Sequence, residues 1–233
     1  MSVLAVIPAR GGSKGLPGKN LRPLAGRSLL EHALRFAARV PEIERTVVST
    51  DSDEIAAAAR ALGADVPFVR PAELARDETP MWPVLRHALD TLDPAGTRYD
   101  ALVLLDPTSP VRDPADLSEA LRRLWADPNA DGVVGVSEPR YSPIWHAVVE
   151  DDGYLRHLVP EGARLGRRQD VRRAWVIDGS LYAWRASFVR SESETWFNGR
   201  NLLQRVRGGW SIDTAEELAE LEALAEAGVV SLP

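Results

Sequence analysis

The feature that most constrains the fold is an alternation of apolar runs with amphipathic segments along the first 140 residues. The spacing predicts strands over 3–9, 45–51, 65–70, 100–110 and 131–138, and helices over 28–40, 53–63, 83–92 and 114–127. Strands separated by helices of this length form βαβ units. We therefore predict an α/β fold with a mostly parallel, Rossmann-like sheet and helices on both faces.

The pattern changes after residue 139. Residues 139–175 contain short alternating stretches, several turns and clusters of arginine, which predict an inserted antiparallel hairpin excursion. Strand character returns over 176–189, and a capped helix is expected over 211–228. No low-complexity linker divides the chain, so we expect one domain over 1–233. A long hairpin carrying Trp and Arg is poorly suited to stand alone in water, so 139–175 is expected to mediate dimerisation.

Composition excludes several classes of partner and cofactor. The net charge is −6, so there is no basic field to hold a nucleic-acid backbone. The absence of cysteine excludes disulfides, iron–sulfur clusters and thiolate zinc sites. No apolar run approaches the roughly 18 residues of a membrane helix, and no signal peptide begins the chain. We expect a cytoplasmic protein that binds small molecules and is associated with neither nucleic acid nor membrane.

A glycine-rich segment, "ARGGSKGLPGKN" (9–20), follows the first predicted strand and carries Arg10, Lys14 and Lys19. Backbone N–H groups and cations at such a strand end cradle phosphates in many folds. The segment is neither a P-loop nor a G-x-G-x-x-G dinucleotide fingerprint. The alternative is a solvated loop, but three neighbouring cations repel one another unless an anion joins them.

The segment "IPARGGSKGLPGKNLRPLAGRSLLEHAL" resembles the N-terminal signature of the acylneuraminate cytidylyltransferases, the CMP-sialic acid synthetases. The resemblance continues in "VVSTDSDEIA", "VRPAELARDET", "LLDPTSPVRDPADL", "RRQDVRRAWVIDGSLYAW" and "SIDTAEELA", and so spans nearly the whole chain. It implies a nucleotide-diphospho-sugar-transferase-like fold, a homodimer, Mg²⁺ as cofactor, and transfer of CMP from CTP to an acidic sugar with release of pyrophosphate.

The resemblance also implies roles for individual residues. Arg10, Lys14 and Lys19 match positions that act on the CTP phosphates, and the matching CTP-binding positions are Ala9, Gly11, Gly12, Ser13, Asn20 and Arg70. An alternative for Arg70 is a surface side chain held by Glu73.

The metal motifs depart from the family pattern. The usual "DID" is here Ser211-Ile212-Asp213, and the Gln of "LLQPTSP" is Asp106. We expect Asp106 and Asp213 to bracket one Mg²⁺ in place of the usual pair. The alternatives are an Asp213 that caps the terminal helix, with Glu216 completing a capping box, and an Asp106 that caps the turn at Thr108 or Ser109.

The acceptor half of the site departs further. The positions matched to acceptor binding are Asp106, Arg168, Gln169, Asp178 and Tyr182, with Asp178 replacing a family Asn. Small hydroxyls of the family become Met81 and Trp82, and an expected Lys aligns loosely with Trp145. The acceptor could thus instead be a phosphonate, a sugar phosphate or a 3-deoxy-ulosonic acid. Two other classes stay open: a catalytically silent CTP-binding protein, and a glycosyltransferase, for which only one Asp stands where a D-x-D motif is expected.

Overall fold

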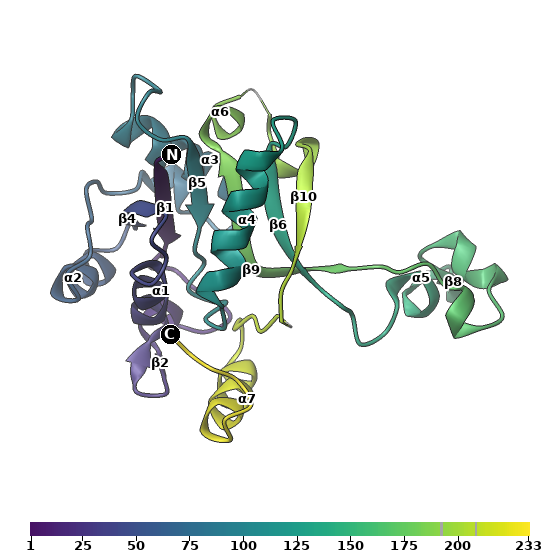
Figure 1. Cartoon of the computed structure of the whole chain (residues 1–233). Coiled ribbons are helices and arrows are strands. Elements are labelled where there is room, and N and C mark those ends of the chain that lie inside the picture. Colours follow the sequence, from purple (N-terminus) through teal and green to yellow (C-terminus); the bar gives the residue numbers. More distant parts are fainter. Residues whose placement is uncertain (192, 208) are drawn as a thin grey trace.

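The structure, a computed structural model, describes residues 1–191, 193–207 and 209–233, and for Arg168 the backbone alone. Within these residues, six strands form one sheet in the order β10-β6-β9-β5-β1-β4 (Figure 1). Their bounds are Val3–Pro8 (β1), Ile43–Ser49 (β4), Ala101–Leu104 (β5), Gly132–Ser137 (β6), Val176–Arg185 (β9) and Asn201–Arg205 (β10).

The sheet is mostly parallel, as predicted. β1 pairs in parallel with β4 and β5, and β6 with β10. β9 runs antiparallel between β5 and β6. Every residue of β1 is buried, which explains why its sequence is continuously apolar rather than alternating.

Helices cover both faces of this sheet. α1 (Leu29–Ala37), α2 (Asp53–Ala61) and α4 (Pro114–Ala126) pack on the face that receives Val3, Ala5 and Ile7 of β1. α3 (Met81–Leu92) and α6 (Ala186–Val189) pack on the face that receives Leu4 and Val6. The alternation of β1 side chains between two cores therefore fixes which helices lie on each face.

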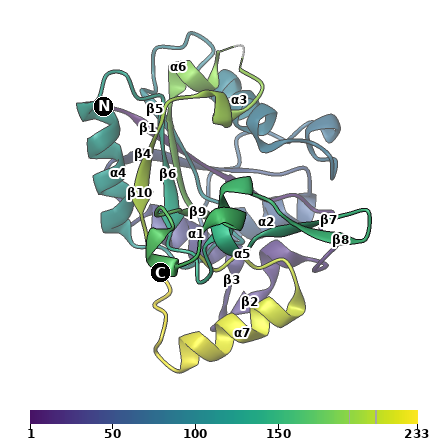
Figure 2. The same ribbon diagram turned by 90° about the vertical axis from the view of Figure 1, so that its right-hand side faces the viewer.

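A third cluster lies beyond the sheet. α7 (Ala215–Glu226) packs against β2 (Pro23–Leu24) and β3 (Arg27–Ser28), as Figure 2 shows. Its buried members include Leu16 of the glycine-rich segment and Ile212. This cluster brings the C-terminal motif next to the N-terminal one, although about 200 residues separate them in sequence.

Residues 139–175, called the arm below, stand away from the sheet between β6 and β9 (Figure 1). The arm contains α5 (Pro143–His146), the predicted hairpin as β7 (Val148–Asp151) and β8 (Tyr154–His157), and the short helices η3 (Pro160–Arg164) and η4 (Arg168–Asp170). No helix in the described part of the chain is long and apolar enough to cross a membrane.

Three predicted elements need correction, and one strand was missed. The strand over 65–70 consists of two isolated bridges to β4 and its end, because Pro67 has no N–H to donate to a ladder. The strand over 176–189 ends at Arg185, where α6 begins and buries Ala186 and Val189. β10 was not predicted, because its half-exposed edge position leaves no clear alternation.

The terminal helix begins later than expected. α7 starts after Thr214, whose side chain forms a capping box with Glu217, so the box expected from Asp213 and Glu216 is wrong. Ile212 is buried and donates its N–H to the carbonyl of Thr108 at 2.8 Å. This long-range bond holds residue 212 outside the helix.

Candidate active site

The glycine-rich segment leaves the carboxyl end of β1 and is anchored by three hydrogen bonds. Ala9 N–H donates to Ser49 O at 2.9 Å, and Gly11 N–H donates to Asp51 Oδ1 at 3.0 Å. The buried Asn20 amide donates to the carbonyl of Arg10 at 3.1 Å. These bonds fix both ends of the segment, whereas Gly12 at its middle is exposed.

The three cations of this segment each meet a carboxylate from a distant part of the chain. Arg10 Nη1 lies 2.5 Å from Asp77 Oδ1, and Lys14 pairs with the other oxygen of Asp77. Lys19 Nζ lies 2.8 Å from Asp213 Oδ1. The Lys19 side chain is 14% exposed and that of Lys14 83%, so Lys19 is held far more firmly.

Arg70 is buried rather than at the surface, so its alternative role as an exposed partner of Glu73 is wrong. Its guanidinium donates to Ser49 Oγ at 3.1 Å and to the carbonyl of Ser49, at the end of β4. Burial, together with the positive charge of Arg10, lowers the pKa of Arg70 to about 10. Arg70 therefore remains cationic at neutral pH.

Asp106 follows the carboxyl end of β5 and caps a turn. Its Oδ1 accepts from Thr108 N at 3.1 Å and from Thr108 Oγ1 at 3.0 Å, which confirms the turn-capping interpretation. The carbonyl of the same Thr108 accepts from Ile212 N, so the Ser211–Asp213 motif runs beside this turn. A Cβ on Gly15 would stand 2.6 Å from Asp213 O, so this close approach requires glycine.

The carboxylates of Asp106 and Asp213 are oxygen donors of the kind that Mg²⁺ prefers, and each sits on one of these two adjoining segments. The Asp213 side chain is 67% exposed and Asp106 is half-buried. Among the described residues, no group of three or more His, Asp or Glu gathers to hold a metal. The donor set therefore fits an ion that keeps waters or phosphate oxygens as its other ligands.

Beside Asp106 lies a cavity of about 230 Å³, called the aromatic cavity below. Aromatic rings from three elements form much of its wall: Trp82, Tyr182, Trp184 and Trp196. The rings of Tyr182 and Trp184 stack at 5.4 Å, and Trp82 meets Trp184 edge-on at 5.1 Å. Its polar wall comprises Asp106, Thr108, Ser109 and Ser211.

A bulge in β9 shapes the mouth of this cavity. Pairing with β6 shifts between Val134 and Val136, and Gly179 has φ of +85°, which favours glycine. Asp178 is buried, and its Oδ1 accepts from Ser180 N at 3.2 Å. Burial, with the negative charges of Asp106 and Asp178, raises the pKa of Tyr182 to about 12, so this phenol stays neutral.

The predicted acceptor residues are only partly brought together. Asp106 and Tyr182 line the aromatic cavity, and Asp178 lies next to Gly179 in its wall. Gln169 is exposed on the arm, and the side chain of Arg168 lies outside the described residues. Sequence reasoning missed Asp77 and Arg112 as contributors, although both lie inside motifs that carried the family resemblance.

Comparison with known proteins agrees with this geometry. The family described as cytidylyltransferase matches residues 4–130. The chain is 39% identical over 230 residues to CMP-N,N'-diacetyllegionaminic acid synthase of Legionella pneumophila, covering 97% of each chain. It is 28% identical over 225 residues to pseudaminic acid cytidylyltransferase of Campylobacter jejuni, covering 94% of each.

The fold has a close counterpart among solved structures. A CMP:2-keto-3-deoxy-manno-octonic acid synthetase complexed with CTP superposes with a TM-score of 0.74 at 21% identity. The match covers 98% of this chain and 100% of that one. The sequence matches add what the fold alone does not: this chain belongs to the cytidylyltransferase family, as its resemblance to the acylneuraminate cytidylyltransferases implied.

Proposed function

We propose that this protein transfers CMP from CTP to an acid sugar of the N-acylneuraminate (nonulosonate) type and releases pyrophosphate. The observation that carries the proposal is the glycine-rich segment at the carboxyl end of β1, whose Arg10, Lys14 and Lys19 each pair with a carboxylate. A loop that gathers three cations at a strand end suits a triphosphate. The relatives named for legionaminic and pseudaminic acid support a nonulosonate acceptor.

In the proposed reaction, a hydroxyl oxygen of the acceptor forms a bond to the α-phosphorus of CTP. The bond from that phosphorus to the β-phosphate oxygen breaks, and pyrophosphate leaves with the electron pair, while the hydroxyl proton passes to water. Arg10 and Lys14 neutralise the charge that develops on the departing phosphates. Lys19 and Asn20 hold the nucleotide end of the loop in place.

Arg70 supports the glycine-rich segment indirectly, through the end of β4. Its bonds to Ser49 fix the end of β4, on which the glycine-rich segment rests through the bond from Ala9. Because it stays cationic at neutral pH, it adds to the positive field that attracts a nucleotide.

Mg²⁺ is the proposed cofactor, with Asp106 and Asp213 as its protein ligands. When bound, the ion supplies additional neutralisation of phosphate charge. Lys19 holds Asp213 Oδ1 in place on the side facing the loop. The two bonds from Thr108 orient the carboxylate of Asp106.

The aromatic cavity is the proposed acceptor site. Its aromatic wall suits an apolar substituent such as an N-acyl methyl group, and Tyr182 offers a hydroxyl that stays protonated across the physiological range. Ser109 and Ser211 supply hydroxyl donors for the polar part of the sugar.

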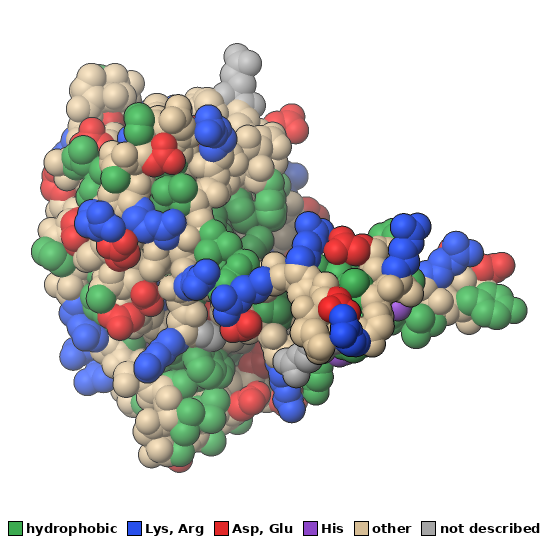
Figure 3. Space-filling view, turned by 45° about the vertical axis from the view of Figure 1, so that its right-hand side comes forward, with side chains coloured by type: hydrophobic (Ala, Val, Ile, Leu, Met, Phe, Trp, Pro, Cys, Tyr) green, Lys and Arg blue, Asp and Glu red, His purple; other side chains and the backbone are tan. Residues whose placement is uncertain are grey.

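The protein is proposed to act as a homodimer in the cytoplasm, where CTP is made. The arm exposes Val148, Val149, Tyr154, Leu155 and Leu158. Figure 3 shows hydrophobic and basic side chains next to one another on the projecting part of the molecule. An isolated two-stranded ribbon is only marginally stable in water, so a second copy is the proposed cover. Gln169, which is exposed on the arm, is then proposed to contribute to an acceptor site in the dimer.

The test is pyrophosphate release from CTP and Mg²⁺ across a panel of acceptors. The panel holds N-acetylneuraminate, N,N'-diacetyllegionaminate, pseudaminate, 3-deoxy-octulosonate and an aminoalkylphosphonate. We expect turnover with a nonulosonate and its loss in Asp106→Asn. Turnover only with one of the last two acceptors contradicts the proposed acceptor class. CTP binding without turnover on any acceptor would favour a silent CTP-binding protein.

A further inference from the structure

Arg112 lies behind the Asp106 turn and joins two backbone segments that form the wall of the aromatic cavity. Its Nε donates to the carbonyl of Ser180 at 2.7 Å, and its Nη2 donates to the carbonyl of Asp106 at 2.5 Å. One planar guanidinium therefore ties the end of β5 to the bulge of β9.

This arginine is held without an ion pair among the described residues. Burial lowers its pKa to about 10, and the charges of Asp106 and Asp178 attract it. Its buried Nη1 has no hydrogen-bond partner within the described part of the chain. Placing a cation in such surroundings is costly, and the two charge-assisted bonds to carbonyls are what offsets that cost.

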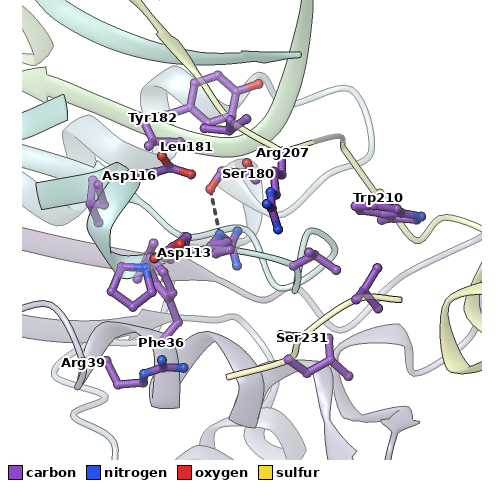
Figure 4. A pocket seen from close by; sticks show the side chains of 18 of the residues that line it. Phe36, Arg39, Asp113, Asp116, Ser180, Leu181, Tyr182, Arg207, Trp210 and Ser231 are labelled. Carbon is purple, nitrogen blue, oxygen red and sulfur yellow. Dashed lines mark hydrogen bonds between the residues drawn. The ribbon is translucent and has the colours of Figure 1, made fainter. Parts of the chain in front are cut away.

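Arg112 also lines a second, larger hollow of about 710 Å³, which Figure 4 shows from close by. It opens on the face of the sheet covered by α1 and α4, and its wall includes Ser180, Tyr182, Asp116 and Arg207. The dashed bond that ends at Ser180 in Figure 4 spans this wall. The hollow borders Arg112 and Ser180, so fewer side chains pack against the β9 end of this link. The Asp106 turn is also held by the bonds from Thr108, and Arg112 adds the bonds that tie the turn to β9.

We propose that Arg112 is a positioning residue that sets the distance between the Asp106 turn and the β9 bulge, and so the geometry of the acceptor site. It acts through those two backbone segments and contacts neither substrate. This role rests on the proposed function, because the aromatic cavity is taken as the place where the acceptor binds.

The test compares Arg112→Ala and Arg112→Lys with a matched control, Arg185→Ala. Arg185 is the last residue of β9 and, like Arg112, donates to backbone carbonyls, those of Ala130, Leu124 and Asp127, away from the bulge. Thermal unfolding identifies the variants that fold, and kcat and both KM values are measured for each.

For Arg112→Ala we expect kcat/KM for the acceptor to fall about 100-fold, because displacement of a reacting group by about 1 Å costs that much. At saturating Mg²⁺, KM for CTP should rise less than KM for the acceptor, since the bonds that anchor the cation-bearing loop do not involve Arg112. Arg112→Lys, which keeps the charge but not the two-pronged geometry, should fall in between. Arg185→Ala should lose stability and keep both kinetic constants.

Chemical rescue adds a readout that loss of stability does not give. Because the larger hollow opens onto Arg112, millimolar guanidinium chloride, far below denaturing concentrations, should restore part of the activity of Arg112→Ala. The same concentration of sodium chloride should not, and Arg185→Ala should not respond to either salt.

Equal kinetic losses in Arg112→Ala and Arg185→Ala, or an equal rise of KM for both substrates, overturn the positioning role. If Arg112→Ala fails to fold, Arg112→Lys decides, and wild-type kinetics in that variant overturn the role. A wild-type protein without turnover on any acceptor overturns the proposed function and this role together. Turnover by wild type with unaffected Arg112 variants overturns the role alone.

Discussion

Arg10 and Lys14 share the carboxylate of Asp77, and we expect this pairing to weaken the binding of the nucleotide. Hydrogen bonds from Lys14 and Arg10 hold the pKa of Asp77 below its usual value, so the group is anionic at neutral pH. An anion that already neutralises two cations competes with an incoming phosphate for both. We therefore expect Asp77 to lower the affinity of the loop for CTP.

We predict that Asp77→Asn binds CTP more tightly, by up to about fivefold, because an exposed ion pair that competes with the phosphates is weak. Titration calorimetry at fixed low salt measures the change. Glu119→Gln, which breaks an exposed ion pair with Arg122 on α4, serves as control and should bind CTP like wild type. Weaker binding by Asp77→Asn would mean that the carboxylate organises the loop instead of competing for it.

Residue types at the site were largely predictable, whereas their partners were not. The glycine-rich spacing predicted Arg10, Lys14 and Lys19 as phosphate-binding residues, and their binding of CTP stays a prediction. Asp77 and Arg112 escaped, because nothing in a one-dimensional pattern states which carboxylate or carbonyl lies across the fold. The two bonds of Arg112 depend on where β5 ends and where β9 bulges, which is a property of the sheet.

At the scale of elements, the start of α7 sets the position of the Ser211–Asp213 motif. Thr214 and Glu217 form the capping box, and Glu217 Oε2 also accepts from the backbone N–H of Asp213 at 2.7 Å. One helix start therefore fixes the backbone of the proposed metal ligand.

Thr214→Ala removes this cap and should lower the free energy of unfolding by about 1 kcal/mol. Urea denaturation followed by circular dichroism measures the loss. Ser52→Ala, which removes the N-cap of α2, is the control. It should lower the free energy of unfolding by a similar amount and leave the Mg²⁺ dependence of the activity unchanged. A Thr214→Ala protein with unchanged stability would show that the cap adds nothing in solution.

The same box predicts a pH dependence. Hydrogen bonds from the backbone N–H groups of Asp213 and Thr214 lower the pKa of Glu217. A carboxyl whose pKa is lowered on folding stabilises the fold above its unfolded value of about 4.5, and that contribution disappears as the pH falls through the folded value. The stability gap between wild type and Glu217→Gln should be constant above about pH 5 and shrink below it. Chemical denaturation along a pH series tests this, and a gap that widens toward acid contradicts it.

Most elements followed from periodicity, and the failures share one cause. Continuous apolar runs gave β1, β5 and β6 because burial on both faces leaves no choice of residue type. The strand expected over 65–70 forms only isolated bridges, because Pro67 has no N–H to donate. β10 was missed because an edge strand depends on pairing with its neighbour, here β6, more than on the preferences of its own residues. Tertiary contacts decided these segments.

At the scale of the whole molecule, the arm is the least covered part of the structure. The side chains of Tyr154 and Leu155 at its tip are 75% and 71% exposed. Its hairpin was predictable from alternation, but the sequence could not show how far it projects from the sheet.

We therefore expect light scattering at micromolar concentration to give the wild-type protein a mass of about twice that of its 25.5 kDa chain. Replacing Tyr154 and Leu155 together by Asp should raise the dissociation constant at least about 100-fold, because central apolar contacts each contribute about 2 kcal/mol. Leu62→Asp, which changes an exposed leucine after α2, is the control. A monomeric wild-type protein would contradict the proposed assembly.

β9 leaves the arm at Val176, and within four residues its bulge reaches the wall of the aromatic cavity at Gly179. The arm and one wall of the proposed acceptor site are thus parts of a single uninterrupted strand. An exchange of arms between members of this family would also exchange part of that wall. The range of acceptors and the proposed mode of dimerisation would then be inherited together. An evolutionary change in one would also change the other.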